Sequence, residues 1–420
     1  MCVNHCFEKT LHYNSPGHGG WGIIRVAALI PESHLLFICP SACFRHGSLG
    51  AVQHGYKDKT SYLYITPSDV ITGYDAVIEQ GVEELMENDP GIKVLFLFAA
   101  CIDDFIGTDM DAIAKQMSEK YSGLVVRTCH MNPIAADTSK PPLVTVYQSM
   151  LSTIPVTDRE KENAVNLLGK FVPIPEECEM HEFFAFHGIE RVRQIANYEK
   201  FEAFCEMGTS KYNLVISPSA RFTADYMDKT YHTVSAFSVI SYDLEEIRKN
   251  YEQIEESLFP DVAEKFDVTQ IEEKAKEAIG RALEKVKDIL IVVSDSAVMR
   301  PFSLAKALLS YGFQVKEVVA QTAISVDKEA YETLLEAYPD VKIIQPLHHQ
   351  AAVREKAGEG MVAIGFEGAY LRQCDYVVDL SDDEGMYGYY GVMKLMEMLE
   401  KSVEEKADLR SMIEEYGAVV

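Results

Sequence analysis

Short apolar segments alternate with amphipathic segments along most of this 420-residue chain, and this alternation limits the folds that it can adopt. The runs at 94–101, 211–217 and 288–295 are apolar, and each is followed by a stretch with helical spacing of its apolar residues. In the stretch 102–121 these residues are Met110, Ile113, Ala114 and Met117. Continuous apolar strands between helices are typical of parallel sheets that are covered on both faces. The pattern therefore predicts an α/β protein with mostly parallel sheets.

The chain is too long for one ordinary core, so two or three domains are expected. A polar interruption at 152–164 follows the first group of strands, and a charged stretch at 267–288, predicted as a connector helix, precedes a fresh strand. We therefore predict three Rossmann-like domains: a first α/β domain at 1–155, a second domain with the connector helix at 156–287, and a third domain with C-terminal helices at 288–420.

The net charge, the lengths of the apolar runs and the absence of certain motifs argue against a nucleic-acid partner, a membrane span and a bound nucleotide. A net charge of −26 argues against a nucleic-acid partner, which requires a Lys/Arg surface. The longest apolar runs are far shorter than a membrane span, and no signal peptide opens the chain, so a cytoplasmic protein is expected. No P-loop motif is present, so we expect this chain to bind no nucleotide.

The cysteines suggest chemistry at one edge of the first sheet. There are nine, an odd number in a chain without a secretion signal, which argues against a disulfide framework. Cys39 and Cys43 follow one predicted strand and Cys101 follows another, and the carboxyl ends of parallel strands share one edge. Thiolates suit iron–sulfur clusters. From spacing alone, three buried core cysteines or a redox couple at Cys39 and Cys43 remain alternatives.

The stretch CIDDFIGTDMDAI, residues 101–113, resembles the signature of the nitrogenase component 1 family, which includes the protochlorophyllide and chlorophyllide reductases and a nickel-tetrapyrrole reductive cyclase. The matching residues are Cys101, Ile106, Gly107, Asp109 and Ala112. Thr108 stands where the family usually has an aspartate. Gly107 permits a tight turn into the next helix, and Asp109 suits that helix's amino end.

The resemblance implies a set of cluster ligands. Cys43 stands where the family has a cluster cysteine, and its interval of 58 residues to Cys101 is similar to that of the family's beta-type subunit. A third family cysteine falls near 15–22, where this chain has glycines and no cysteine. Cys43 and Cys101 are therefore the expected ligands. Cys39 is the candidate third, although it is also the one most easily explained as a core residue.

Other positions bear on the cluster and on the substrate. Cys2 and Cys6 are further candidates to complete the cluster. Ser217 and Tyr387 stand where the nitrogenase alpha subunit has a Cys and a His for its large cofactor. We therefore expect this chain not to hold that cofactor in the same way and not to reduce dinitrogen. With Cys129, these two residues are the predicted lining of a substrate cavity between the domains.

The resemblance implies an oxidoreductase component with a 4Fe-4S cluster. Its electrons would come from a separate ATP-dependent iron–sulfur reductase, and it would act as a homodimer or as a heterodimer with a related subunit. Two alternatives remain: a non-catalytic scaffold that assembles or carries a metallocofactor, and a binding-protein-like sensor without a cluster.

Overall fold

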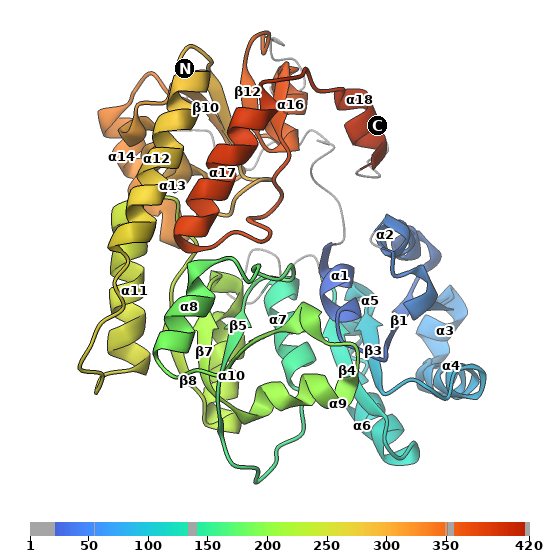
Figure 1. Ribbon diagram of the computed structural model, residues 1–420. Helices are drawn as coiled ribbons and strands as arrows, with labels where there is room; N and C mark the ends of the chain where they lie inside the picture. Colours follow the sequence, from blue (N-terminus) through green and yellow to red (C-terminus); the bar gives the residue numbers. More distant parts are fainter. Residues whose placement is uncertain (1–21, 54, 133–140, 349–350, 352–356, 416–420) are drawn as a thin grey trace. The chain divides into compact units, whose positions relative to one another are not determined.

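The computed structural model describes residues 22–53, 55–132, 141–348, 351 and 357–415 (Figure 1). These residues form two compact units. The first comprises the described residues of 20–173 together with 189–237, and the second comprises 174–188 together with those of 238–415. Cys2, Cys6 and most of the glycine-rich stretch at 15–22 lie outside the described residues.

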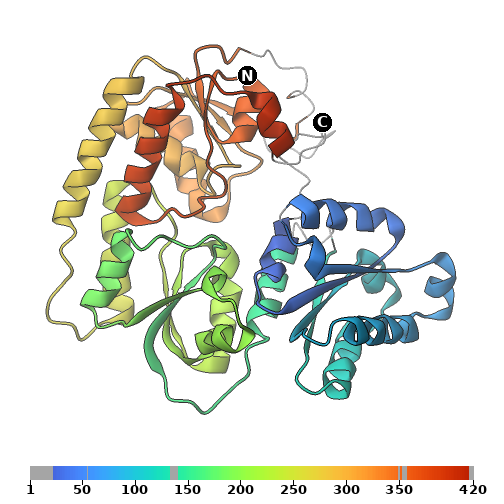
Figure 2. The same cartoon turned by 45° about the vertical axis from the view of Figure 1, so that its right-hand side comes forward.

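The first unit contains two parallel sheets. One has the strand order β2-β1-β3-β4 and the other β6-β5-β7-β8, and every strand pair in both is parallel. Both sheets are drawn in Figures 1 and 2. The strands are β1 (Ser33–Cys39), β2 (Thr60–Tyr64), β3 (Val94–Ala99), β4 (Val125–His130), β5 (Glu162–Leu168), β6 (Arg191–Gln194), β7 (Ser210–Val215) and β8 (Val234–Phe237).

Helices cover both faces of the first sheet because its strands are apolar on both sides. All seven residues of β1 and all six of β3 are buried. On one face they pack against α1 and α7, in an apolar cluster that continues into α10 beside the second sheet. On the other face they pack against α4 and α6. The helices of this unit are α1 (Gly22–Ala28), α2 (Ser41–Gln53), α3 (Pro67–Thr72), α4 (Asp75–Asn88), α5 (Cys101–Ile106), α6 (Met110–Lys120), α7 (Pro142–Leu151), α9 (Phe201–Phe204) and α10 (Arg221–Tyr231).

The second unit contains a five-stranded parallel sheet with the order β11-β10-β9-β12-β13. The first strand in sequence lies at the centre and the connections run outward in both directions, as in a Rossmann sheet. The strands are β9 (Ile291–Ser294), β10 (Val315–Val319), β11 (Lys342–Ile344), β12 (Val362–Ile364) and β13 (Tyr376–Val378). The helices are α8 (Glu179–Phe186), α11 (Leu244–Leu258), α12 (Thr269–Val286), α13 (Pro301–Tyr311), α14 (Lys328–Ala337), α16 (Phe366–Arg372), α17 (Gly388–Ser402) and α18 (Leu409–Glu415).

The predicted fold class is therefore confirmed: the chain is α/β, and its sheets are parallel. The expected connector at 267–288 is α12, whose buried residues pack along α17. In the described part of the chain, no helix combines the length and the apolar character needed to cross a membrane. The exact domain boundaries at 155 and 287 remain a prediction.

Candidate functional site

The candidate site lies at the carboxyl edge of the first sheet, where β1 and β3 end side by side. Ile38 of β1 is opposite Ala99 of β3 in the parallel register. Cys39 is the last residue of β1, Cys43 lies in the first turn of α2, and Cys101 is the first residue of α5. The structure thus brings the three cysteines to one edge, as the strand pattern predicts.

The thiols of Cys39 and Cys43 have raised pKa values. Burial and, after it, the neighbouring Cys101 raise the pKa of the Cys43 thiol. Burial, followed by Cys43 and the carboxyl group of Asp103, raises the pKa of Cys39 to about 12. Thiols at such positions stay protonated near neutral pH unless a cation holds them as thiolates. The raised pKa values therefore argue against a reactive thiolate at Cys39 or Cys43 in the absence of a cation.

The three cysteines differ in exposure. Cys43 and Cys101 are partly exposed, whereas Cys39 is only 4% exposed and belongs to the apolar cluster between the sheet and α1. In the described part of the chain, no three His, Cys, Asp or Glu side chains converge as the ligands of a single metal ion would. A cluster spreads its ligands over several iron atoms, so this finding concerns a single metal ion, and the cluster ligands Cys43 and Cys101 remain a prediction.

The turn after Cys101 has the predicted form. Gly107 ends α5 in the left-handed conformation, with φ of 76°. Asp109 then caps α6, because its carboxylate accepts a hydrogen bond of 3.0 Å from the backbone N–H of Ala112. The stretch 102–121 is therefore two helices, and Gly107 makes the break between them.

A buried carboxyl group lies two residues after Cys101 on α5, and the sequence alone did not reveal its burial. Asp103 is 1% exposed, and it accepts a hydrogen bond from the hydroxyl of Tyr74. Thr108 donates to the same hydroxyl at 3.1 Å. Burial raises the pKa of Asp103. Tyr74 directly precedes α4, whose apolar residues pack on the face of the first sheet opposite to α1 and α7. The contact between Asp103 and Tyr74 therefore fixes the start of α5 to the start of α4.

A second carboxylate of α5, that of Asp104, contacts His130 at the end of β4. Asp104 Oδ1 lies 3.1 Å from Nδ1 of His130, and its Oδ2 accepts a hydrogen bond of 2.9 Å from the side-chain amide of Asn132. The imidazole is partly exposed, with 44% of the side chain accessible. His130 is the last residue of β4 and lies opposite Ala99 in register. The sequence showed this histidine only as the neighbour of Cys129.

Cys129 and Ser217 lie in the same unit as the cysteine edge, but both are buried. Cys129 lies inside β4 rather than past its end, is 1% exposed and faces the apolar cluster with α7. Burial raises the pKa of its thiol. Ser217 follows β7, is 1% exposed, and its hydroxyl lies 2.8 Å from that of Ser219. Gly169 approaches it so closely that a Cβ there would lie 2.6 Å from the Cβ of Ser217.

Tyr387 belongs to the second unit. Its side chain is 3% exposed, and its hydroxyl lies 2.7 Å from that of Ser238. It precedes α17, whose first backbone N–H groups donate to the buried carboxylate of Glu179, from Tyr389 at 2.6 Å and from Tyr390 at 3.0 Å. The hydroxyl of Tyr387 therefore serves an internal contact of this unit. The roles predicted for Cys129, Ser217 and Tyr387 in a substrate cavity remain predictions.

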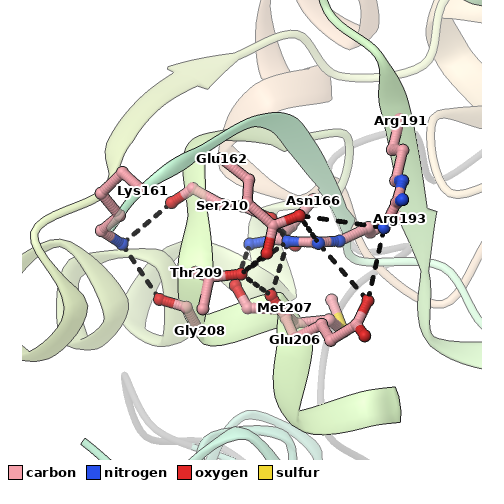
Figure 3. A network of polar contacts seen from close by, with 10 residues as sticks. All are labelled: Lys161, Glu162, Asn166, Arg191, Arg193, Glu206, Met207, Gly208, Thr209 and Ser210. Carbon is pink, nitrogen blue, oxygen red and sulfur yellow. Dashed lines mark hydrogen bonds and ion pairs between the residues drawn. The ribbon is translucent and has the colours of Figure 1, made fainter. Parts of the chain in front are cut away.

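A polar network, also absent from the sequence expectations, ties the strands of the second sheet at their amino ends (Figure 3). The buried guanidinium of Arg193 donates to the backbone oxygen of Glu206 at 2.5 Å, to Ser210 Oγ at 2.9 Å and to the carboxylate of Glu162 at 2.7 Å. The side-chain amide of Asn166 donates to the backbone oxygen of Met207 at 2.9 Å. Since ligands bind at the carboxyl ends of such sheets, this network is structural.

Comparison with known proteins identifies the group to which the chain is similar. The family model described as nitrogenase component 1 type oxidoreductase matches residues 20–404. The nitrogenase iron-molybdenum cofactor biosynthesis protein NifE of Clostridium pasteurianum is 23% identical over 295 residues, covering 69% of this chain and 63% of that protein. The nitrogenase molybdenum-iron protein alpha chain of Methanococcus maripaludis is 21% identical over 284 residues, covering 67% and 58%.

A solved structure, "Nitrogenase Cp1 at pH 6.5", has the same fold, with a TM-score of 0.68 at 16% identity over 94% of both chains. The chain spans about three fifths of the length of the curated relatives that it matches. These matches confirm the resemblance inferred from CIDDFIGTDMDAI.

Proposed function

Because the chain belongs to the nitrogenase component 1 type oxidoreductase family, we propose that it is an electron-transfer component that binds a 4Fe-4S cluster. It receives low-potential electrons from an ATP-dependent iron–sulfur reductase and passes them to a substrate other than dinitrogen. The observation that carries this proposal is the pair of partly exposed thiols, Cys43 and Cys101, at the ends of adjacent strands.

Each ligand has a distinct support in the fold. Cys101 is fixed by the start of α5, which the Asp103–Tyr74 contact anchors, and Cys43 is fixed by the first turn of α2. Cys39 is the candidate third ligand from the sequence, and its burial sets it apart from the other two. When bound, the cluster supplies one-electron transfer at low potential.

Two internal contacts support the exclusion of a nitrogenase-type cofactor. The hydroxyls of Ser217 and Tyr387 are bonded to Ser219 and Ser238, so both serve the packing of their own units. Neither side chain is a thiolate or an imidazole, the ligands that the resemblance assigns to these positions in the alpha subunit. An organic substrate therefore suits the chain better than a large metal cofactor.

A second subunit is part of the proposal, either a copy of this chain or a related one. Apolar side chains are exposed on α5, which carries Cys101, and on β2, which pairs with β1: Phe105 of α5 is 69% exposed, Ile106 is 44% exposed, and Tyr64 at the end of β2 is 52% exposed. Burying such a surface favours association. We expect the cluster-loaded chain to sediment as a dimer and Phe105→Asp to shift it toward monomer; an unchanged dimer in that variant would exclude this surface.

The function is tested by electron delivery. Under anaerobic conditions, the reduced iron–sulfur reductase and MgATP should bleach the visible absorbance of the cluster-loaded chain. The same mixture with a non-hydrolysable ATP analogue should not do so. A cluster that dithionite reduces, but that the reductase with MgATP leaves oxidised, would contradict the proposal.

The second candidate is an assembly scaffold, because three of the relatives are named as cofactor biosynthesis proteins. A scaffold releases its metal group to an acceptor protein, whereas an electron-transfer component keeps its cluster through many reductions. Iron labelled with ⁵⁷Fe on this chain distinguishes the two. Label that stays on the chain during repeated reduction supports electron transfer, and label that passes to a nitrogenase-type acceptor supports the scaffold.

A further inference from the structure

We propose that His130, held by Asp104, is the third ligand that this chain gives to the cluster, and that Cys39 is a structural residue of its strand end. This inference rests on the proposed function, since it names the ligand set of the same site. Two independent observations carry it: a pattern shared by three strand ends, and the contact between Asp104 and His130.

The same short motif follows a strand in all three sheets. Cys39-Pro40-Ser41-Ala42 ends β1, Ser217-Pro218-Ser219-Ala220 follows β7, and Ser294-Asp295-Ser296-Ala297 ends β9. The first side chain is buried in each case, with exposures of 4%, 1% and 0%. Cys39 is thus the sulfur counterpart of two buried serines.

In the second and third sheets, the first side chain of the motif has a defined structural role. The hydroxyl of Ser217 lies 2.8 Å from Ser219 Oγ and accepts from the Ser219 backbone N–H at 3.4 Å. The hydroxyl of Ser294 lies 3.0 Å from Ser296 Oγ and accepts from the Ser296 backbone N–H at 3.4 Å. Because this role is the same in two sheets, we assign Cys39 to the same structural position. A serine should therefore serve there as well.

His130 occupies a better place for a ligand. Its Cα lies opposite Ala99, two residues before Cys101, so it lies on the strand next to the cysteine loop. Cys101 and Asp104 are three residues apart on α5 and share one helix face. Asp104, which contacts the ring, therefore lies one helical turn after Cys101 on α5.

The Asp104–His130 contact has the form that metal-binding histidines show. Such histidines donate one ring N–H to a carboxylate or carbonyl, which fixes the tautomer and leaves the other nitrogen for the metal. Here Nδ1 faces Asp104, and Asn132 holds the second carboxylate oxygen in place. Nε2 makes no hydrogen bond with the described residues. With 44% of the side chain exposed, the ring is open to an incoming cluster.

The experiment reconstitutes the purified full chain anaerobically with ferrous iron and sulfide, and measures iron per chain and the nitrogen hyperfine coupling of the reduced cluster. Cys39→Ser should hold as much iron as the wild type. His130→Ala should lose most of it. His130→Cys should keep iron, lose the histidine nitrogen coupling and show a lower midpoint potential, because histidine in place of cysteine raises the potential. Asp104→Asn should weaken iron binding about 10- to 100-fold.

Retained iron with unchanged nitrogen coupling in His130→Ala, or loss of iron in Cys39→Ser with unchanged thermal unfolding, would overturn the inference. A wild-type chain that takes up no iron would instead overturn the proposed function. Because the His130 side chain is partly exposed, its substitution should leave the fold intact. Circular dichroism and thermal unfolding that match the wild type would show that a loss of iron comes from the lost ligand and not from misfolding.

Discussion

At the residue scale, the missing side chain of Gly169 allows two strand ends of the second sheet to meet. Its φ of 112° is a conformation that L-residues rarely adopt, and an added Cβ would lie 2.6 Å from the Cβ of Ser217. We expect Gly169→Ala to lower the free energy of unfolding by roughly 3 kcal/mol. Chemical denaturation measures this change.

Gly280 provides the matched control. It lies on an exposed face of α12, with no atom within 4 Å of its Cβ position. Gly280→Ala should therefore raise the stability by about 0.5–1 kcal/mol. If Gly169→Ala and Gly280→Ala changed the free energy of unfolding equally, the assigned close approach of Gly169 to Ser217 would be contradicted.

Residue roles that depend on neighbours in sequence could be predicted, whereas roles that depend on distant contacts could not. Gly107 and Asp109 were identified because turns and helix caps are local. Tyr74 and Asp103 are 29 residues apart, and Asp104 and His130 are 26 apart. Each pair forms only when β1, β3 and β4 align, so no local pattern marks it. The exposure of a cysteine is equally non-local, so the sequence leaves Cys39 both a candidate ligand and a candidate core residue.

At the element scale, the network around Arg193 should stabilise the second sheet (Figure 3). Arg193→Met removes a buried guanidinium and leaves several oxygens of β5, β7 and the intervening turn without their donor. We expect a loss of about 3 kcal/mol in the free energy of unfolding.

Arg191 forms ion pairs with the same two glutamates, Glu162 and Glu206, at 3.8 and 3.7 Å, but its side chain is 61% exposed. Arg191→Met should therefore cost less than about 1 kcal/mol. Equal losses in the free energy of unfolding for Arg193→Met and Arg191→Met would show that the burial of Arg193 adds nothing to the stability of the sheet.

The pairing of β1 with β2 should depend on pH through His34. This side chain is buried, its Nε2 lies 2.9 Å from Ser61 Oγ, and burial lowers its pKa. A lowered folded-state pKa favours the neutral ring, so its contribution is complete above the ordinary histidine pKa of about 6.5 and is lost as the pH falls below it. His34→Gln should show a smaller loss of stability on acidification than the wild type.

The control for this experiment is His232→Asn. His232 is exposed at the end of α10 with φ of 57°, a conformation that Asn tolerates. Its acid destabilisation should match that of the wild type. A His34→Gln chain whose stability falls with pH as steeply as the wild type would contradict the assignment.

Elements were predictable where periodicity is strong. The four apolar residues expected on one helix face are the buried residues of α6. The helix itself begins at Met110 rather than near residue 102, because Gly107 ends the short α5. The charged stretch that begins at Leu244 forms α11, which also buries Tyr251 and Glu255, so it is less solvated than its composition indicates.

At the scale of the whole molecule, the number and kind of sheets followed from the sequence, but the grouping of elements did not. Helix α8 connects two strands of the second sheet, yet it groups with the unit of 238–415, where Glu179 caps α17. The partner of that carboxylate is 210 residues away in the chain. Such an arrangement depends on tertiary packing, which local patterns do not encode.

The most direct test of the central claim is the iron and acid-labile sulfide content of the anaerobically purified chain, measured beside Cys43→Ser, Cys101→Ser and the control Cys205→Ser. Cys205 is a partly buried thiol outside the site. We predict that the wild type and Cys205→Ser contain equal iron and sulfide, and that the other two variants lose most of both. A wild type without iron and sulfide, or equal contents in all four proteins, would contradict the claim that Cys43 and Cys101 hold a cluster.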